Sequence, residues 1–178
     1  HFNSKEDGVD FFSDYDDFFT EMNRVVCSWL PLAADSILCG KQDVFVDTDI
    51  VTLEHDLDLE EVLRTNEKLI VVRPRIHFGQ MWYDIMINDF RRSSVGITSR
   101  LSATLFEMLA CGIPVLIKES ANPNRIFGDV SFIREYTSDS IKDTIESSLV
   151  DSKFLASGST AREWILQFAT YEVRAEMI

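Results

Sequence analysis

A group of hydroxyl side chains, one guanidinium and one carboxylate stands between two apolar runs of the sequence. The group consists of Thr98, Ser99, Arg100, Ser102, Thr104 and Glu107. Hydroxyls and a guanidinium donate hydrogen bonds to phosphate oxygens. A carboxylate repels phosphate but accepts hydrogen bonds from the paired hydroxyls of a ribose. These side-chain types predict a site for a nucleotide whose sugar and phosphate lie side by side.

The spacing around this group predicts a strand followed by a helix. Residues 95–98 form a short apolar run, and apolar residues then recur at helical spacing through 101–109. Thr98, Ser99 and Ser102 lie where a helix over 100–111 needs N-caps, and Gly112 lies where it needs a left-handed residue to end. The start of a helix just beyond a strand favours anions, because its backbone N–H groups lack partners and its dipole is positive there.

Helical periodicity divides this helix into two stripes. At about 100° per residue, Arg100, Thr104 and Glu107 project along one stripe, whereas the leucines project from another. We expect the leucines to face the sheet and the polar stripe to be free to meet a ligand. The simpler alternative is that the serines only cap the helix and that Glu107 is exposed and solvated.

The segment from residue 98 to 117 reads TSRLSATLFEMLACGIPVLI. It resembles the nucleotide-sugar-binding segment in the C-terminal domain of GT-B-fold glycosyltransferases, which has a hydroxyl-rich turn, a helix carrying a Glu, and small-Gly-x-Pro-Val before an apolar strand. The resemblance implies that Glu107 holds the ribose. It also implies that Ser99, Ser102 and Thr104 contact the diphosphate.

Ser99 stands where the retaining enzymes of this fold carry a second Glu. The segment is therefore more similar to the inverting type, which includes capsule and teichoic-acid transferases and the lipid II-forming N-acetylglucosaminyltransferase. Some similarity to polysaccharide pyruvyltransferases and nucleotide-sugar 2-epimerases also exists. The resemblance implies the donor-binding half of an inverting transferase of polysaccharide biosynthesis. Its partners would be a nucleotide-sugar donor and an acceptor domain, N-terminal or on another subunit, that supplies the general base.

A second pattern suggests metal chemistry. Asp47 and Asp49 follow an apolar run at 43–46 and resemble the Asp-x-Asp site of GT-A-fold glycosyltransferases. Two such carboxylates can share a Mg²⁺ or Mn²⁺ that bridges phosphate oxygens. That fold normally has a complete nucleotide-binding βαβ unit upstream, and only 42 residues precede the run. We expect no cofactor and keep the metal-dependent enzyme and a non-catalytic interaction module as alternatives.

The alternation of patterns after residue 42 predicts the fold. Strands are expected at 43–46, 69–72, 95–98, 114–117 and 130–133. Helices are expected at 56–65, 80–92, 100–111, around 141–149 and at 161–177. This order predicts an α/β, Rossmann-like parallel sheet of about five strands with helices on both faces. Residues 1–42 would form a helical or linker segment, and 43–178 the nucleotide-binding domain.

Polar residues at other strand exits are expected near the same crevice, because the carboxyl ends of parallel strands lie together. Arg73 follows the run at 69–72, which we expect to be buried on both faces of the sheet. Arg73 and Arg75 could clamp phosphate, with His77 as a further donor, although an Arg at a strand exit is often only solvated. Asn122 lies in the polar loop after the run at 114–117.

Composition limits the partners and the compartment. Seventeen basic against thirty acidic residues give a net charge of −13, so we expect no nucleic acid partner. Cys27, Cys39 and Cys111 lack paired spacing, which favours reduced thiols in a cytoplasmic protein. No apolar run approaches the ~20 residues of a membrane span, so any membrane contact would be peripheral and made by other parts. A start without Met indicates a fragment.

Overall fold

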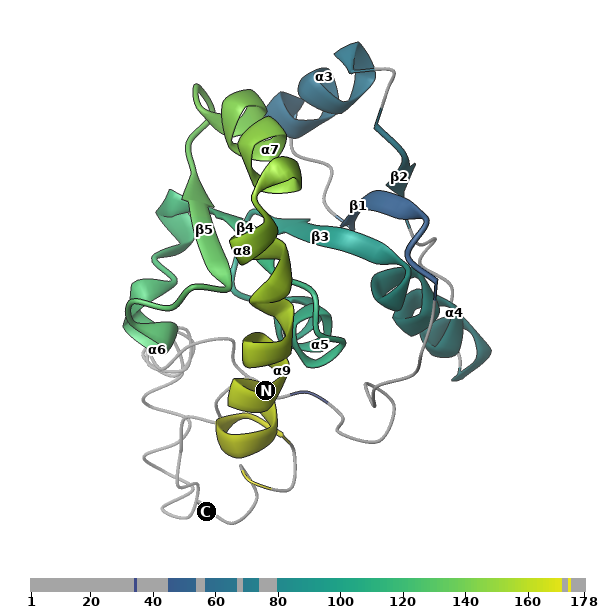
Figure 1. Cartoon of the computed structure of the whole chain (residues 1–178), viewed down its shortest axis with the longest axis vertical. Helices are drawn as coiled ribbons and strands as arrows, with labels where there is room; N and C mark the ends of the chain where they lie inside the picture. The colour runs from purple at the N-terminus through teal and green to yellow at the C-terminus, as the bar shows by residue number, and fades with distance from the viewer. Residues whose placement is uncertain are drawn as a thin grey trace, which may run out of the picture.

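The computed structural model describes residues 34, 45–53, 57–66, 69–73, 80–170 and 173, without the side chains of 57, 58 and 80–83. Strands and helices alternate along this part of the chain (Figure 1). The strands are β1 (Thr48–Thr52), β2 (Val71–Val72), β3 (Ser93–Thr98), β4 (Val115–Lys118) and β5 (Ile133–Tyr136). The helices are α3 (Leu57–Thr65), α4 (Gln80–Arg91), α5 (Ala103–Ala110), η1 (Glu119–Ala121), α6 (Asn124–Phe127), α7 (Ile141–Val150), α8 (Ser152–Ala156) and α9 (Gly158–Phe168).

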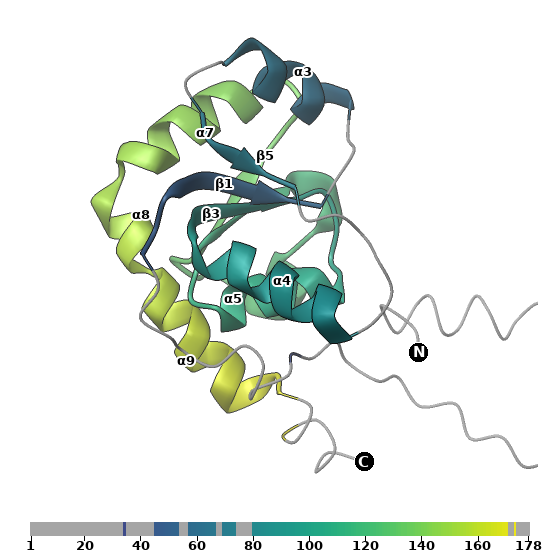
Figure 2. The same cartoon turned by 90° about the vertical axis from the view of Figure 1, so that its right-hand side faces the viewer.

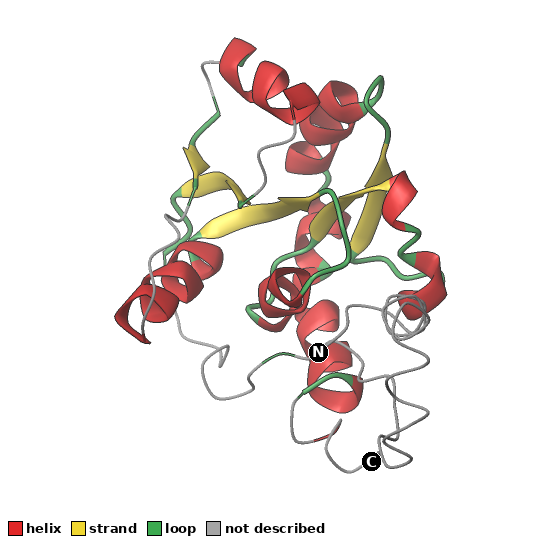
Figure 3. Cartoon of the chain, turned by 180° about the vertical axis from the view of Figure 1, so that it is seen from behind, coloured by secondary structure: helices red, strands yellow, loops and turns green. Residues whose placement is uncertain are grey.

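The strands, yellow in Figure 3, lie side by side in one sheet. All five are parallel and their order is β2-β1-β3-β4-β5. The predicted α/β, Rossmann-like fold is therefore confirmed. The strand order changes direction between β1 and β3, because β2 and β3 lie on opposite sides of β1. All five strands end at the same end of the sheet, which we call the carboxyl end. Open α/β sheets bind ligands there, at the point where the order changes direction.

Helices cover both faces of the sheet, and the two faces bury separate apolar clusters. In Figure 2 the helices α3 and α7 lie on one side of the sheet and α4 and α5 on the other. Side chains of α3, α7 and α8 pack on Ile50, Ile97 and Leu116, whereas those of α4, α5 and α9 pack on Val51 and Ile117. Each strand thus sends alternate residues to opposite faces, as expected for a sheet buried on both sides.

Two predicted strands are displaced along the sequence. The prediction at 43–46 is wrong for its described part, since Phe45 is 83% exposed and the strand begins at Thr48. The prediction at 130–133 is wrong because β5 extends to Tyr136, which pairs with Lys118 of β4. Both true strands contain buried or half-buried polar residues, which an apolar-run criterion does not select. β2 was expected to be buried on both faces, but it lies at the sheet edge and is half-buried.

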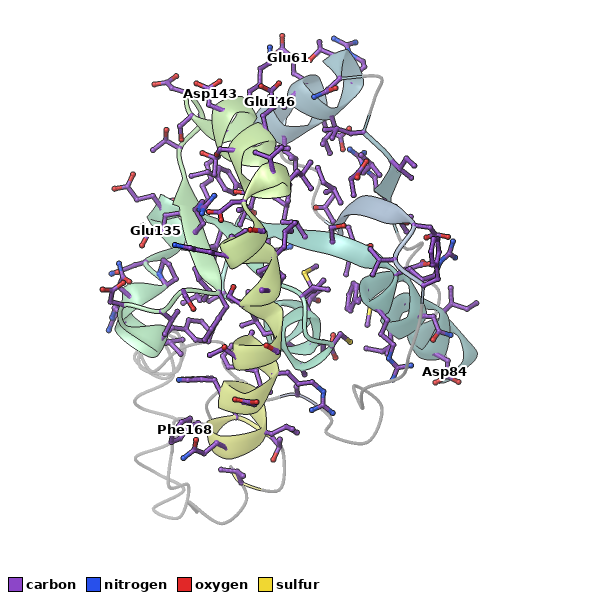
Figure 4. All side chains as sticks on the ribbon, viewed as in Figure 1. Glu61, Asp84, Glu135, Asp143, Glu146 and Phe168 are labelled. Atoms are coloured by element: carbon purple, nitrogen blue, oxygen red, sulfur yellow. The ribbon has the colours of Figure 1, made fainter. Side chains whose placement is uncertain are left out.

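The helices agree better with the predictions than the strands do. α3 and α4 begin and end within about two residues of the expected positions. Within α4, Ile85 is exposed whereas Ile87 is buried. The short helix α8 was not predicted, and its Phe154 is buried. The helix expected at 161–177 is α9, which begins earlier and ends at Phe168, whose side chain is 45% exposed (Figure 4).

The proposed N-terminal segment 1–42 lies outside the described residues except for Ala34, as do Cys27 and Cys39. Ala34 is fully buried, pairs in parallel with Thr170, and donates its backbone N–H to Ala169 at 2.9 Å. Ala34 therefore lies beside the residues that directly follow α9. Among the described helices, none combines the length and apolar character needed to cross a bilayer.

An ion pair between β5 and the start of α8 holds the last helices to the sheet. The Arg134 guanidinium donates to Asp151 Oδ2 at 2.7 Å and to Ser148 Oγ at 2.9 Å. Asp151 also caps α8, because its other oxygen accepts from the Lys153 and Phe154 backbone N–H groups. The hydrogen bond from Arg134, helped by these N–H groups, lowers the pKa of the Asp151 carboxyl.

Replacing Asp151 with Asn should therefore lower the Tm near neutral pH and lower it less in acid. A lowered carboxyl pKa contributes stability above the pKa of the unfolded chain, and this contribution is lost as the pH falls through the folded-state pKa. The asparagine oxygen can keep the cap to the backbone N–H groups, so the pH-dependent part of the difference reports the ion pair with Arg134. Thermal melts of both proteins at neutral pH and at about pH 3 test this. A Tm difference that is independent of pH would contradict it.

Candidate functional site

The candidate site is the β3–α5 turn, residues 99–102, at the carboxyl end of the sheet. β3 lies between β1 and β4, next to the point where the strand order changes direction. Close packing fixes the turn, because α5 lies directly on β3. A Cβ added to Gly96 would lie 2.6 Å from Met108 Sδ and 3.2 Å from Val115. Glycine at this position lets the helix approach the strand.

α5 ends close to the predicted position but starts later than predicted, at Ala103 instead of residue 100. Ser102 is the N-cap, and its hydroxyl oxygen accepts from the Leu105 N–H at 3.4 Å. Gly112 has a φ of +84°, and the N–H groups of Gly112 and Ile113 bond to Leu109 and Met108 carbonyls. This is the Schellman arrangement that commonly ends a helix. The helix therefore begins at Ala103, and residues 99–101 are free of helical constraint.

Thr98, the last residue of β3, hydrogen-bonds to the backbone of the turn. Its hydroxyl donates to the Arg100 carbonyl at 3.1 Å and accepts from the Arg100 N–H at 3.4 Å. Thr98 is 1% exposed. Its hydroxyl is therefore buried and bonded to the backbone of the turn. A phosphate contact of the Thr98 hydroxyl stays a prediction, which its hydrogen bonds to the Arg100 backbone do not support.

Four predicted residues are brought together at the accessible surface of the turn. Arg100 is exposed, and Ser99, Ser102 and Thr104 are half-buried. They lie just before the first turn of α5 or within it, where backbone N–H groups and the positive end of the helix dipole favour an anion. The arrangement can thus bind phosphate through hydroxyls, N–H groups and one guanidinium.

Glu107 differs from its expected environment. It lies in the second turn of α5 and is only 7% exposed. α5 contacts the sheet on one side and α4 and α9 on others, and every residue from Leu105 to Ala110 is buried. The open polar stripe predicted for this helix is therefore wrong beyond Thr104. A ribose contact at Glu107 stays a prediction that its burial does not support.

Arg73 and Asn122 lie at strand exits, as predicted. Arg73 follows β2, two strands away from β3, and its guanidinium pairs with the Glu60 carboxylate of α3. This ion pair directs Arg73 toward α3. Asn122 is exposed after β4, with a left-handed φ of 51°. Arg75 and His77 lie outside the described residues.

Asp47 and Asp49 lie at the opposite end of the sheet, the amino end. β1 begins at Thr48, so both acids stand at its start and not at its exit. Asp47 accepts from the Arg92 guanidinium at 2.6 and 3.1 Å, which lowers the pKa of the Asp47 carboxyl. Asp49 accepts from the Ile70 N–H at 2.9 Å. The expected strand-exit position of this pair is therefore wrong. In the described part of the chain, no three His, Cys, Asp or Glu side chains cluster as metal ligands would.

Tyr136 contributes a hydrogen bond at the turn that was not predicted from the sequence. Its hydroxyl donates to the Thr98 carbonyl at 3.3 Å, although β4 lies between β5 and β3. The prediction ended the last strand at Ile133, which left Tyr136 in a loop. The run Ile133-Arg134-Glu135-Tyr136 has two charged residues between its apolar ends and does not alternate, so it carries no period-two signal for a strand.

No protein-family model matches the chain, and no curated protein sequence matches it. Its structure is similar to that of spinosyn forosaminyltransferase SpnP, with 14% sequence identity and a TM-score of 0.49. The likeness covers 86% of this chain and 45% of that chain, so the chain spans less than half of that enzyme's length. The strand order and the two helical layers thus carry the assignment of the described residues to an α/β, Rossmann-like fold.

Proposed function

We propose that this chain is the donor-binding half of a GT-B-type glycosyltransferase that uses a nucleotide-activated sugar. The observation that carries the proposal is the position of the β3–α5 turn. It places three half-buried hydroxyl residues and the exposed Arg100 at the carboxyl end of the sheet, beside the change in strand order. The resemblance of residues 98–117 to the nucleotide-sugar-binding segment of this fold supports the same ligand.

In this proposal the turn binds the diphosphate of the donor. Backbone N–H groups at the start of α5, together with Ser99, Ser102 and Thr104, would donate to phosphate oxygens. Arg100 would add a charge-assisted hydrogen bond. These donors would stabilise the negative charge that develops on the diphosphate as the sugar leaves. Glu107 has no part in this binding step, because it is buried.

Transfer with inversion requires a general base that removes the proton of the acceptor hydroxyl as the new glycosidic bond forms. We assign this base to an acceptor-binding domain or subunit beyond the described residues. The chain by itself should then bind the donor but turn it over slowly or not at all. Polysaccharide biosynthesis is the proposed role of the complete enzyme.

Calorimetric titration of the purified chain with UDP, CDP, GDP and CMP tests the binding step. We expect at least one nucleotide to bind with a submillimolar Kd. The matching nucleoside should bind at least about tenfold more weakly, because it lacks the charge-assisted contacts of the phosphates. Absence of heat and of thermal stabilisation with all four nucleotides at millimolar concentration would refute the proposal and favour a non-catalytic interaction module.

A further inference from the structure

The β3–α5 turn is held by a side chain from a strand that does not touch β3. Thr98 pairs with Ile117 of β4, and Lys118 of β4 pairs with Tyr136 of β5. Tyr136 therefore reaches across β4 to bring its hydroxyl to the Thr98 carbonyl. Its ring belongs to the apolar cluster on the α3 and α7 face, and the residue is 2% exposed.

The apolar cluster does not need this hydroxyl. A phenylalanine would fill the same space, and burying a phenolic O–H is unfavourable unless the group finds a hydrogen-bond partner. The Thr98 carbonyl supplies that partner at the residue where the strand ends and the turn begins. On the other side of the same residue, the Thr98 hydroxyl bonds to both the N–H and the carbonyl of Arg100. Tyr136 and Arg100 are thus joined through one buried threonine.

We propose that the Tyr136 hydroxyl is a positioning group that keeps the β3–α5 turn in the shape that binds a diphosphate. The part that concerns the diphosphate depends on the function proposed above. Through Thr98, the hydroxyl sets the direction of the Ser99 and Arg100 backbone and hence the place of the Arg100 guanidinium. Tyr136 itself does not touch the ligand, because it is buried behind the end of β3.

Tyr136→Phe tests this directly, because it removes the hydroxyl and keeps the ring in the core. Amide hydrogen exchange of residues 99–102 should become faster, whereas exchange in β1 and β4 should stay unchanged. The affinity for UDP, or for whichever diphosphate binds best, should fall about threefold to tenfold, the range that one hydrogen bond supplies. The affinity for the matching nucleoside should not change.

Ser157→Ala is the matched control. It also removes a buried hydroxyl, which donates to the Phe154 carbonyl at 2.6 Å. Ser157 precedes Gly158, which lies against Gly112 at the opposite end of α5 from the turn. It should lower the Tm without changing exchange in 99–102 or nucleotide affinity. Unchanged exchange in the turn of Tyr136→Phe would overturn the positioning role, as would equal losses of nucleoside and diphosphate affinity. If the wild type binds no nucleotide, the proposed function fails, and the exchange measurement still decides whether Tyr136 orders the turn.

Discussion

Replacing Gly158 with alanine is expected to destabilise the protein by roughly 2–3 kcal/mol, although alanine favours helices over glycine by about 1 kcal/mol. Gly158 is the first residue of α9 and lies against the end of α5. A Cβ at this position would lie 1.9 Å from the Gly112 carbonyl oxygen and 3.2 Å from Pro114. The new Cβ would collide with the backbone carbonyl of Gly112, whose φ is left-handed. No side-chain rotation can relieve this clash. The helix or the α5–β4 connection would have to move.

Urea unfolding curves of Gly158→Ala and the wild type measure this loss. Thr160→Ala is the control, because Thr160 is exposed in the first turn of the same helix and its replacement should change stability by less than about 0.5 kcal/mol. A Gly158→Ala protein as stable as the control would show that α9 does not pack directly on Gly112. In that case the enclosure of α5, and with it the burial of Glu107, would need to be reconsidered.

Replacing Arg100 with alanine is expected to weaken nucleoside diphosphate binding by roughly tenfold to a hundredfold. A hydrogen bond to a charged group contributes about 1.5–3 kcal/mol, and Arg100 is the guanidinium carried by the turn itself. The variant should also lose part of the salt dependence of binding, because one positive charge no longer attracts the phosphates. Calorimetry at low and high salt measures both effects.

Arg64→Ala is the matched control for this experiment. Arg64 is also exposed, and it lies in the last turn of α3 at the amino end of the sheet. The Arg64→Ala substitution removes the same charge from the chain and leaves the β3–α5 turn unchanged. If the two variants bind diphosphate equally, the affinity comes from the overall charge or from another site, and Arg100 has no specific role.

The sequence predicted the order of elements and the position of the turn between β3 and α5, but not the strand boundaries. Helical spacing located α3 and α4 well, because one exposed face leaves a clear periodicity. β1 was misplaced because Phe45 and Val46 are apolar but lie outside the sheet, while Thr48 and Thr52 are polar but buried. In a sheet covered on both faces, alternation gives no signal, and hydrophobicity alone does not fix the ends of a strand.

The contacts inside the site could not be predicted, because they depend on elements distant in sequence. Glu107 is buried since α5 lies between the sheet, α4 and α9, which periodicity within α5 does not reveal. The Thr98 hydroxyl was assigned to a ligand because its bond to the Arg100 backbone depends on turn geometry. Tyr136 can reach Thr98 because the strand order places only one strand, β4, between β5 and β3.

A crystal structure of the chain with the best-binding nucleoside diphosphate tests the central claim most directly. We predict density for the diphosphate against the N–H groups of residues 99–104, with the Arg100 guanidinium within hydrogen-bonding distance of a phosphate oxygen. Diphosphate density beside Asp47 and Asp49 at the amino end of the sheet would contradict the account, as would a fully bound nucleotide whose phosphates lie away from the β3–α5 turn.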